Sequence, residues 1–95
     1  IMDNPKLYKF LNNYDWKIIE NQIYKKFIFK NFSATTKFYN LIAEEADKQN
    51  HHPKVISSYN QLEVFLTTHD EKKITNKDID LGIRINDLFN TKYDE

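Results

Sequence analysis

Cysteine is absent from this chain of 95 residues. Its absence excludes disulfides, thiolate catalysis and cysteine-based zinc sites, and it fits a cytosolic protein. Long hydrophobic runs are absent too, because no apolar stretch approaches the roughly 20 residues that cross a bilayer. No signal-peptide pattern is visible. We therefore expect a cytoplasmic protein with no membrane partner, although the Ile1-Met2 start indicates a trimmed or engineered terminus from which a targeting segment could be lost.

The chain also has no excess of positive or negative charge, because fourteen basic residues balance fourteen acidic ones. Domains that bind nucleic acid usually carry a basic excess, so we expect no nucleic-acid partner. Lysines do cluster within residues 25–30 and again within residues 72–77, where acidic residues accompany them. We interpret both clusters as solvated faces, with a phosphate-binding patch as the alternative.

Glycine and proline are scarce, since Gly82, Pro5 and Pro53 are the only ones. We find no internal repeat and no linker, and we expect a single domain over residues 1–95. Hydrophobic residues make up 40% of the chain and aromatic residues 15%. A chain of this size buries roughly 60–70% of the surface that it exposes when unfolded, which allows a modest core.

Hydrophobic periodicity predicts three helices and four strands. Asn4-Pro5 is typical of a helix start, Ser33 is a candidate cap, and Thr75 with Asp78 predicts a capping box. The expected elements are a helix from Pro5 to about Leu11, strands Trp16–Ile19 and Ile23–Phe29, a helix from Ser33 to about Lys48, strands Lys54–Tyr59 and Gln61–Thr68, and a helix that opens at Thr75. Segregated helices over an antiparallel sheet indicate an α+β domain.

The second expected helix has a broad apolar arc. One face carries Ala34, Phe38, Leu41 and Ile42, and a second strip beside it carries Tyr39, Ala43 and Ala46. That arc is wider than contact with one sheet needs, which suggests an oligomer interface.

All three histidines fall on two connections between elements. Pro53 favours extended backbone at His52, so the neighbouring rings of His51 and His52 point to opposite sides and cannot do the same job. If the second hairpin pairs residues whose numbers sum to about 120, His69 lies near His51. Two imidazoles that flank a small polar substrate can act as general acid and general base, each worth about 10²–10⁴-fold. Asp47, one helical turn before His51, is placed to orient it.

Simpler interpretations stay open at each of these positions. In one alternative, the sole role of the adjacent histidines is to cap the end of a helix and complement its dipole. A three-histidine zinc site is less favoured, because adjacent histidine side chains diverge. Asp78 suits a helix start better than a catalytic role, and Trp16 suits the core better than a substrate platform.

One ordered set of residues spans both connections, namely Asp47, His51-His52-Pro53, Tyr59, His69 and Asp78. Three residues separate Asp47 from His51, nine separate Tyr59 from His69, and eight separate His69 from Asp78. This spacing resembles the signature of the pterin-4a-carbinolamine dehydratases. The flanking segments agree with it: Phe29-Lys30-Asn31-Phe32, Tyr59-Asn60, Leu66-Thr67-Thr68-His69 and Asp78-Ile79-Asp80-Leu81. The resemblance covers nearly the whole chain, and Trp16 falls where the family often has an early tryptophan.

The resemblance implies a four-stranded antiparallel sheet with three helices packed on one face. It implies dehydration of 4a-hydroxytetrahydropterin to quinonoid dihydropterin, in the regeneration of the tetrahydrobiopterin that aromatic amino-acid hydroxylases use. The family needs no metal and no organic cofactor. Its members are usually homodimers or homotetramers, and we expect the same here.

Carried over position by position, the resemblance makes His51 and His69 the acid–base pair. His52 and Asp47 complete the expected catalytic set, with His52 binding the pterin and Asp47 standing where the family commonly has glutamate. The other implied substrate-binding residues are Pro53, Thr68, Asp70, Glu71 and Trp16, and Asp78 and Tyr59 have supporting roles.

The chain departs from the family pattern at three positions. Val55 stands where a tryptophan is common, Asn50 replaces the acidic residue before the first histidine, and Lys73 replaces a loop glycine. These changes bear on substrate fit and rate. Some animal members of the family also act as dimerisation partners of a homeodomain transcription factor, so a non-catalytic dimerisation or transcription-cofactor module is the alternative function.

Overall fold

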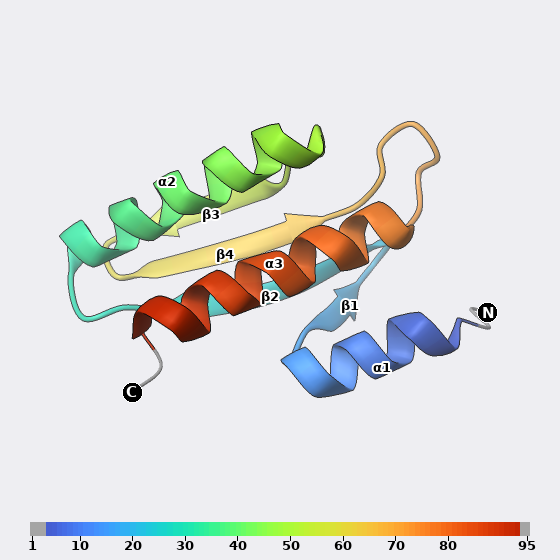
Figure 1. Ribbon diagram of the computed structural model, residues 1–95, viewed down its shortest axis with the longest axis horizontal. Coiled ribbons are helices and arrows are strands. Elements are labelled where there is room, and N and C mark those ends of the chain that lie inside the picture. Colours follow the sequence, from blue (N-terminus) through green and yellow to red (C-terminus); the bar gives the residue numbers. More distant parts are fainter. Residues whose placement is uncertain (1–3, 94–95) are drawn as a thin grey trace.

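Three helices and four strands follow one another in the expected order, which confirms the α+β class (Figure 1). The computed structural model describes residues 4–93, so the Ile1-Met2 start lies outside the described part. The elements are α1 (Pro5–Tyr14), β1 (Lys17–Ile19), β2 (Gln22–Ile28), α2 (Phe32–Gln49), β3 (Lys54–Ser58), β4 (Gln61–Leu66) and α3 (Asn76–Tyr93).

Helix α1 begins as its sequence predicts and ends later. The Asn4 side chain accepts a hydrogen bond from the Leu7 N–H at 3.1 Å, with Pro5 in the first turn. The predicted end at Leu11 was wrong by about one turn. The ring of Tyr14 packs on Phe10 with centroids 5.5 Å apart, and this contact stabilises three further helical residues.

The other two helices begin with side-chain caps. Helix α2 is capped by Asn31, whose side chain accepts from the Ala34 N–H at 2.9 Å, so the predicted Ser33 cap was wrong. The capping box at α3 is confirmed, because the Asp78 carboxylate accepts from the Thr75 N–H at 2.8 Å. Capping of this kind satisfies N–H groups that have no partner within a helix.

The sheet is antiparallel throughout, with strand order β1-β2-β4-β3. In the β3–β4 hairpin Val55 pairs with Val64 and Ser58 pairs with Gln61. Residue numbers therefore sum to 119, one less than expected. Strand β4 ends at Leu66 rather than Thr68, and Thr68 instead makes an isolated bridge with Lys73 in the loop that follows.

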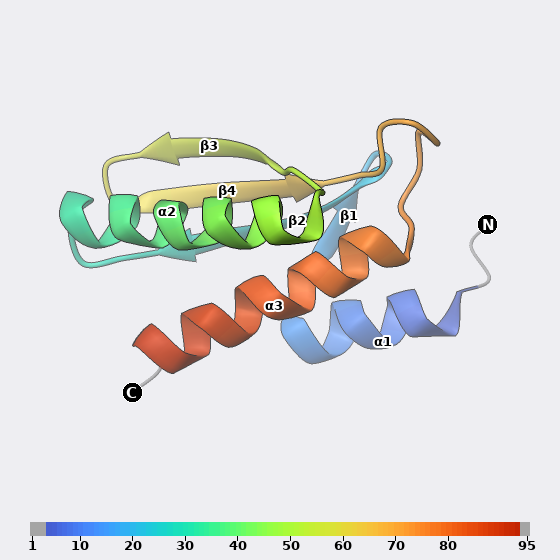
Figure 2. The same cartoon turned by 45° about the horizontal axis from the view of Figure 1, so that its top comes forward.

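The three helices lie on one side of the sheet, and the opposite face is open (Figure 2). Alternate residues of β4 point into the core, where Leu62, Val64 and Leu66 are fully buried. Helix α1 packs chiefly on α3 at Gly82, where an added Cβ would lie 2.6 Å from Cζ of Phe10. No helix within residues 4–93 is long and apolar enough to cross a membrane.

Candidate active site

The end of α2 determines where the first two histidines point. Helix α2 stops at Gln49, and Asn50 adopts left-handed backbone with φ of 52°. The Asn50 N–H then donates to the Asp47 carbonyl at 3.2 Å, and the His51 N–H donates to the Ala46 carbonyl at 3.0 Å. These are the two bonds of a Schellman motif, which reverses the chain at the helix end. His51 therefore leaves the helical register and turns toward α3.

His51 is buried, with 9% of its surface exposed, and it contacts a carboxylate. Its Nε2 lies 2.6 Å from Oδ1 of Asp78, which is fully buried at the first turn of α3. Because an ionised carboxylate only accepts hydrogen bonds, this contact places a proton on Nε2 and leaves Nδ1 as the acceptor. Asp78 thus fixes both the orientation and the tautomer of the ring.

Asp78 is itself held by hydrogen bonds. Its Oδ2 accepts from the Thr68 hydroxyl at 2.8 Å and from the Thr75 N–H at 2.8 Å. The hydroxyls of Thr68 and Thr75 lie 2.6 Å apart. A buried carboxylate with this many donors is satisfied, so its position is rigid. One carboxylate therefore links the loop after β4, the start of α3 and the ring of His51.

Asp47 does not orient His51, contrary to our expectation. The Asp47 carboxylate lies 2.9 Å from Nε2 of His52 instead, and both side chains are exposed. The left-handed Asn50 is the reason, because one helical turn of spacing brings two side chains together only while the helix continues. An exposed pair of this kind is worth about 0–1 kcal/mol.

His69 lies in a tight loop between β4 and α3. The Thr68 and Lys73 backbones bond to each other, and the Lys72 N–H donates to the His69 carbonyl at 3.2 Å, with Lys72 at φ of 54°. These bonds hold the loop closed at its base. His69 and Asp70 are exposed at its tip.

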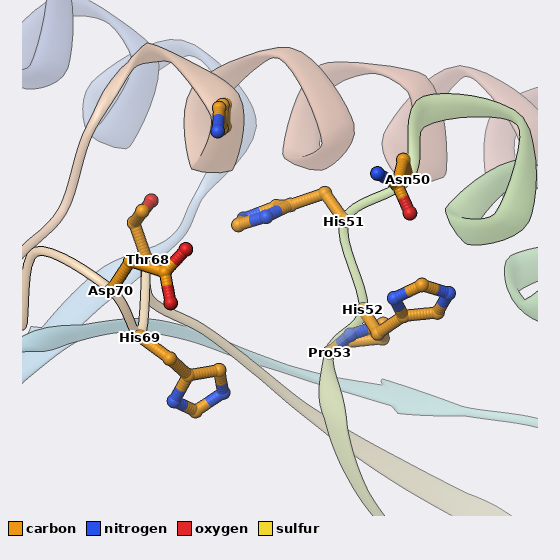
Figure 3. Close-up of a pocket in the computed structure, with 8 residues that line it drawn as sticks. Asn50, His51, His52, Pro53, Thr68, His69 and Asp70 are labelled. Carbon is orange, nitrogen blue, oxygen red and sulfur yellow. The ribbon is translucent and has the colours of Figure 1, made fainter.

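A cleft of about 410 Å³ brings the two connections together. Its lining residues are Asn50, His51, His52, Pro53, Thr68, His69, Asp70 and Lys77. In Figure 3, His51 and His69 come from opposite sides of the cleft, and His52 points away from His51. All three histidines therefore border one cavity, and His51 alone has a buried carboxylate behind it.

Besides Asp47 and Asp78, which contact the rings of His52 and His51, three expected site residues do not line this cleft. Trp16 is 4% exposed, and its indole N–H donates to the Asn86 side chain at 2.7 Å, so it belongs to the core and not to a substrate platform. Tyr59 is exposed in the β3–β4 turn, at the end of the hairpin away from His51. Glu71 borders an adjoining cleft instead.

Two residues of the cleft were missed from the sequence. Lys77 precedes Asp78 in the first turn of α3, but we grouped it with the other lysines of residues 72–77 as part of a solvated face. Asn50 was noted only as a departure from the family pattern. Its place directly after a long helix was the signal, because asparagine is one of the residues that tolerate left-handed backbone there.

The described histidines and carboxylates form no candidate metal site. Within residues 4–93, no group of three or more histidine, aspartate and glutamate side chains could hold an ion. The carboxylates at the cleft are instead divided between two rings, with Asp78 on His51 and Asp47 on His52. The arrangement suits proton transfer by imidazole.

Comparisons with known proteins agree with this geometry. The sequence model of the family described as pterin 4 alpha carbinolamine dehydratase matches residues 2–88. Relatives assigned the name pterin-4-alpha-carbinolamine dehydratase include one from a Picosynechococcus species, 43% identical over 72% of this chain and 74% of its own. Another, from Saccharolobus islandicus, is 40% identical over 86% of this chain and 85% of its own. The crystal structure of a transcriptional coactivator/pterin dehydratase from Brucella melitensis is similar, with a TM-score of 0.83, 30% identity and coverage of 92% and 96%.

Proposed function

Because this chain belongs to the pterin 4 alpha carbinolamine dehydratase family, whose members are hydro-lyases, we propose that it converts 4a-hydroxytetrahydropterin to quinonoid dihydropterin by histidine acid–base catalysis. In this reaction the bond between C4a and the hydroxyl oxygen breaks, and the hydroxyl leaves as water after it gains a proton. A ring nitrogen loses a proton, and its electron pair completes the new C=N bond. The protein must therefore supply one proton donor and one acceptor.

The observation that carries this proposal is the shared cleft of His51 and His69. Two imidazoles that border one cavity from different connections can reach different atoms of one substrate, so one can donate while the other accepts. His51 is the better-positioned base, since Asp78 holds its Nε2 proton and would stabilise the imidazolium that forms. His69 is the proposed acid for the leaving hydroxyl.

Four of the other cleft residues are proposed to bind the pterin ring. His52 and Pro53 border the cleft beside the end of α2, and Thr68 and Asp70 border it beside the β4–α3 loop. A carboxylate such as Asp70 accepts hydrogen bonds from the N–H groups on the pyrimidine edge of a pterin. Asp47 would act only through His52, at the exposed rim.

Self-association as a homodimer or homotetramer is also proposed. On α2, Tyr39 is 40% exposed and Ala43 is exposed on the same helix face. Ala46, which we assigned to this strip, is fully buried and belongs to the core instead. The exposed strip is therefore narrower than expected, but it still offers an apolar surface to a second copy.

A second candidate function is a binding module without catalysis. The similar Brucella melitensis protein is described as a transcriptional coactivator as well as a pterin dehydratase, which motivates this alternative. A spectrophotometric dehydration assay with freshly generated carbinolamine separates the two. Acceleration over the uncatalysed reaction supports the enzyme, and an uncatalysed rate at high protein concentration would favour the module.

A further inference from the structure

Lys77 borders two clefts at once. It lines the cleft of the histidines and also an adjoining cleft of about 420 Å³. The second cleft is otherwise lined by Asn4, Glu71, Lys73, Ile74, Thr75 and Asn76. The two clefts therefore share Lys77 as a common wall, and a ligand in the first can extend past it into the second.

The charge of Lys77 is not used by the fold. Among residues 4–93, its ammonium makes no ion pair and no hydrogen bond, whereas Lys73 beside it lies 3.9 Å from Glu71. The nearest buried carboxylate, Asp78, is already occupied by His51, Thr68 and Thr75. A cation at a cleft wall with no internal partner is available to a ligand.

The pterin ring is a poor partner for this cation. Its pyrimidine edge presents the 2-amino and N3–H donors beside a single carbonyl oxygen, and Asp70 suits those donors better than an ammonium does. The ring alone also leaves the adjoining cleft empty, since ligand clefts of about 300–1,000 Å³ hold molecules much larger than one bicycle. The substituent at C6 of the pterin is the part that can reach past Lys77.

Resting on the proposed function, we propose that Lys77 selects pterins whose C6 side chain carries an anionic group, a carboxylate or a phosphate. The ring then lies between His51 and His69, and the side chain extends along the first turn of α3 into the adjoining cleft. The ammonium of Lys77 binds the anion, with Lys73 as a second, partly neutralised cation. Lys77 is a specificity-determining residue in this account, and it moves no proton.

Equilibrium binding tests this assignment without turnover. Stable 7,8-dihydropterins with a dihydroxypropyl, a carboxylate or a phosphate tail are titrated against the full chain by fluorescence quenching. We expect the two anionic tails to bind about five-fold more tightly than the neutral one, as one charge pair at a partly exposed site allows. Tighter binding of the phosphate ligand than of the carboxylate ligand would support a preference that grows with the charge of the tail. Salt at about 1 M reduces the preference, because it screens exposed charges.

Lys77→Gln removes the charge and keeps most of the side chain. We expect it to abolish the preference for anionic tails while binding of the neutral ligand stays unchanged. Lys37→Gln, an exposed lysine on α2 away from both clefts, gives the same change in net charge and should leave the preference intact. Equal binding of all three ligands by the native chain would overturn the proposal. So would an equal loss of neutral and anionic ligands in Lys77→Gln, because the lysine would then contact the ring. Absence of turnover in the dehydration assay, with the preference intact, would refute the proposed function alone.

Discussion

Nε2 of His51 and Oδ1 of Asp78 lie 2.6 Å apart although the two residues are 27 positions apart in the chain. The contact exists because the Schellman motif at Asn50 turns His51 toward the first turn of α3, where Asp78 also caps the helix. One carboxylate thus performs a structural and a positioning task.

Asp78→Asn is predicted to lower kcat while the fold survives. The amide keeps the size of the carboxylate and can still accept from Thr75, but it cannot hold the Nε2 proton of His51 in the same way. We expect a loss of about 10- to 100-fold, the usual cost when a group that orients a functional imidazole is changed. Steady-state kinetics with circular dichroism as a check of folding measures it.

Asp47→Asn is the matched control for that substitution. It makes the same chemical change in the exposed partner of His52. We expect less than about a five-fold effect, since an exposed ion pair contributes about 0–1 kcal/mol. A larger loss in Asp47→Asn than in Asp78→Asn would contradict the division of the two carboxylates.

Gly82→Ala is predicted to destabilise the fold. The new Cβ would lie 2.6 Å from the ring of Phe10, so the buried ring or α1 itself must shift. Overpacking of this kind costs about 1–3 kcal/mol, which outweighs the gain in helix propensity. Urea unfolding measures the loss. Phe10→Leu in the Gly82→Ala background should recover part of it, and a stabilised single variant would refute the close approach.

The contact between Tyr24 and Glu63 is predicted to stop stabilising the fold at alkaline pH. Its hydroxyl donates to the Glu63 carboxylate at 2.7 Å, and this hydrogen bond, together with burial and the negative charge of Glu63, raises the pKa of Tyr24 from 10.0 to about 12. The folded protein then keeps a proton that the unfolded chain loses between pH 10 and 12. Stability from this contact is therefore fully present below pH 10 and is lost as pH rises through 12.

Tyr24→Phe isolates that contribution. The variant should unfold at a lower urea concentration than the native chain at pH 9, and the difference should shrink by pH 11.5. Lys25 changes in the opposite sense, since burial lowers its pKa, but both proteins share it. A difference that is constant across this range would contradict the role of the Tyr24–Glu63 contact.

Tyr39→Lys tests self-association through α2. Tyr39 is the exposed aromatic residue of the apolar strip, so a charge there should weaken a helix-to-helix interface without disturbing the core. We expect a smaller mass by light scattering than for the native chain. Lys37→Gln on the same helix is the control. A native chain that is monomeric at high concentration would refute the proposed oligomer.

The architecture followed from local signals. Helical and strand periodicity predicted every element. The second hairpin was expected to pair residues whose numbers sum to about 120, but the two-residue turn Tyr59-Asn60 makes them sum to 119. Errors fell at element ends. Asn31 and Ser33 are both residue types that cap helices well. The sequence alone does not distinguish them, because the packing of α2 on the sheet determines where the helix begins.

The site was less accessible from sequence, because its decisive contact joins distant segments. The capping role of Asp78 was visible locally, whereas its contact with His51 depends on how α3 passes the end of α2. The expected contact between Asp47 and His51 was wrong, because helical spacing was assumed beyond Asn50, where the helix has already ended. Trp16 differs, because the residue itself suited the core, where the structure places it, and only the resemblance implied substrate binding.

The most direct measurement is the rate of carbinolamine dehydration by the native chain and by His51→Ala and His69→Ala. The account predicts that each variant loses about 10²–10⁴-fold in kcat while circular dichroism stays native, since each imidazole carries one proton transfer. Tyr59→Ala, at the far end of the β3–β4 hairpin, should keep full activity. Full activity in both histidine variants would contradict the proposed mechanism.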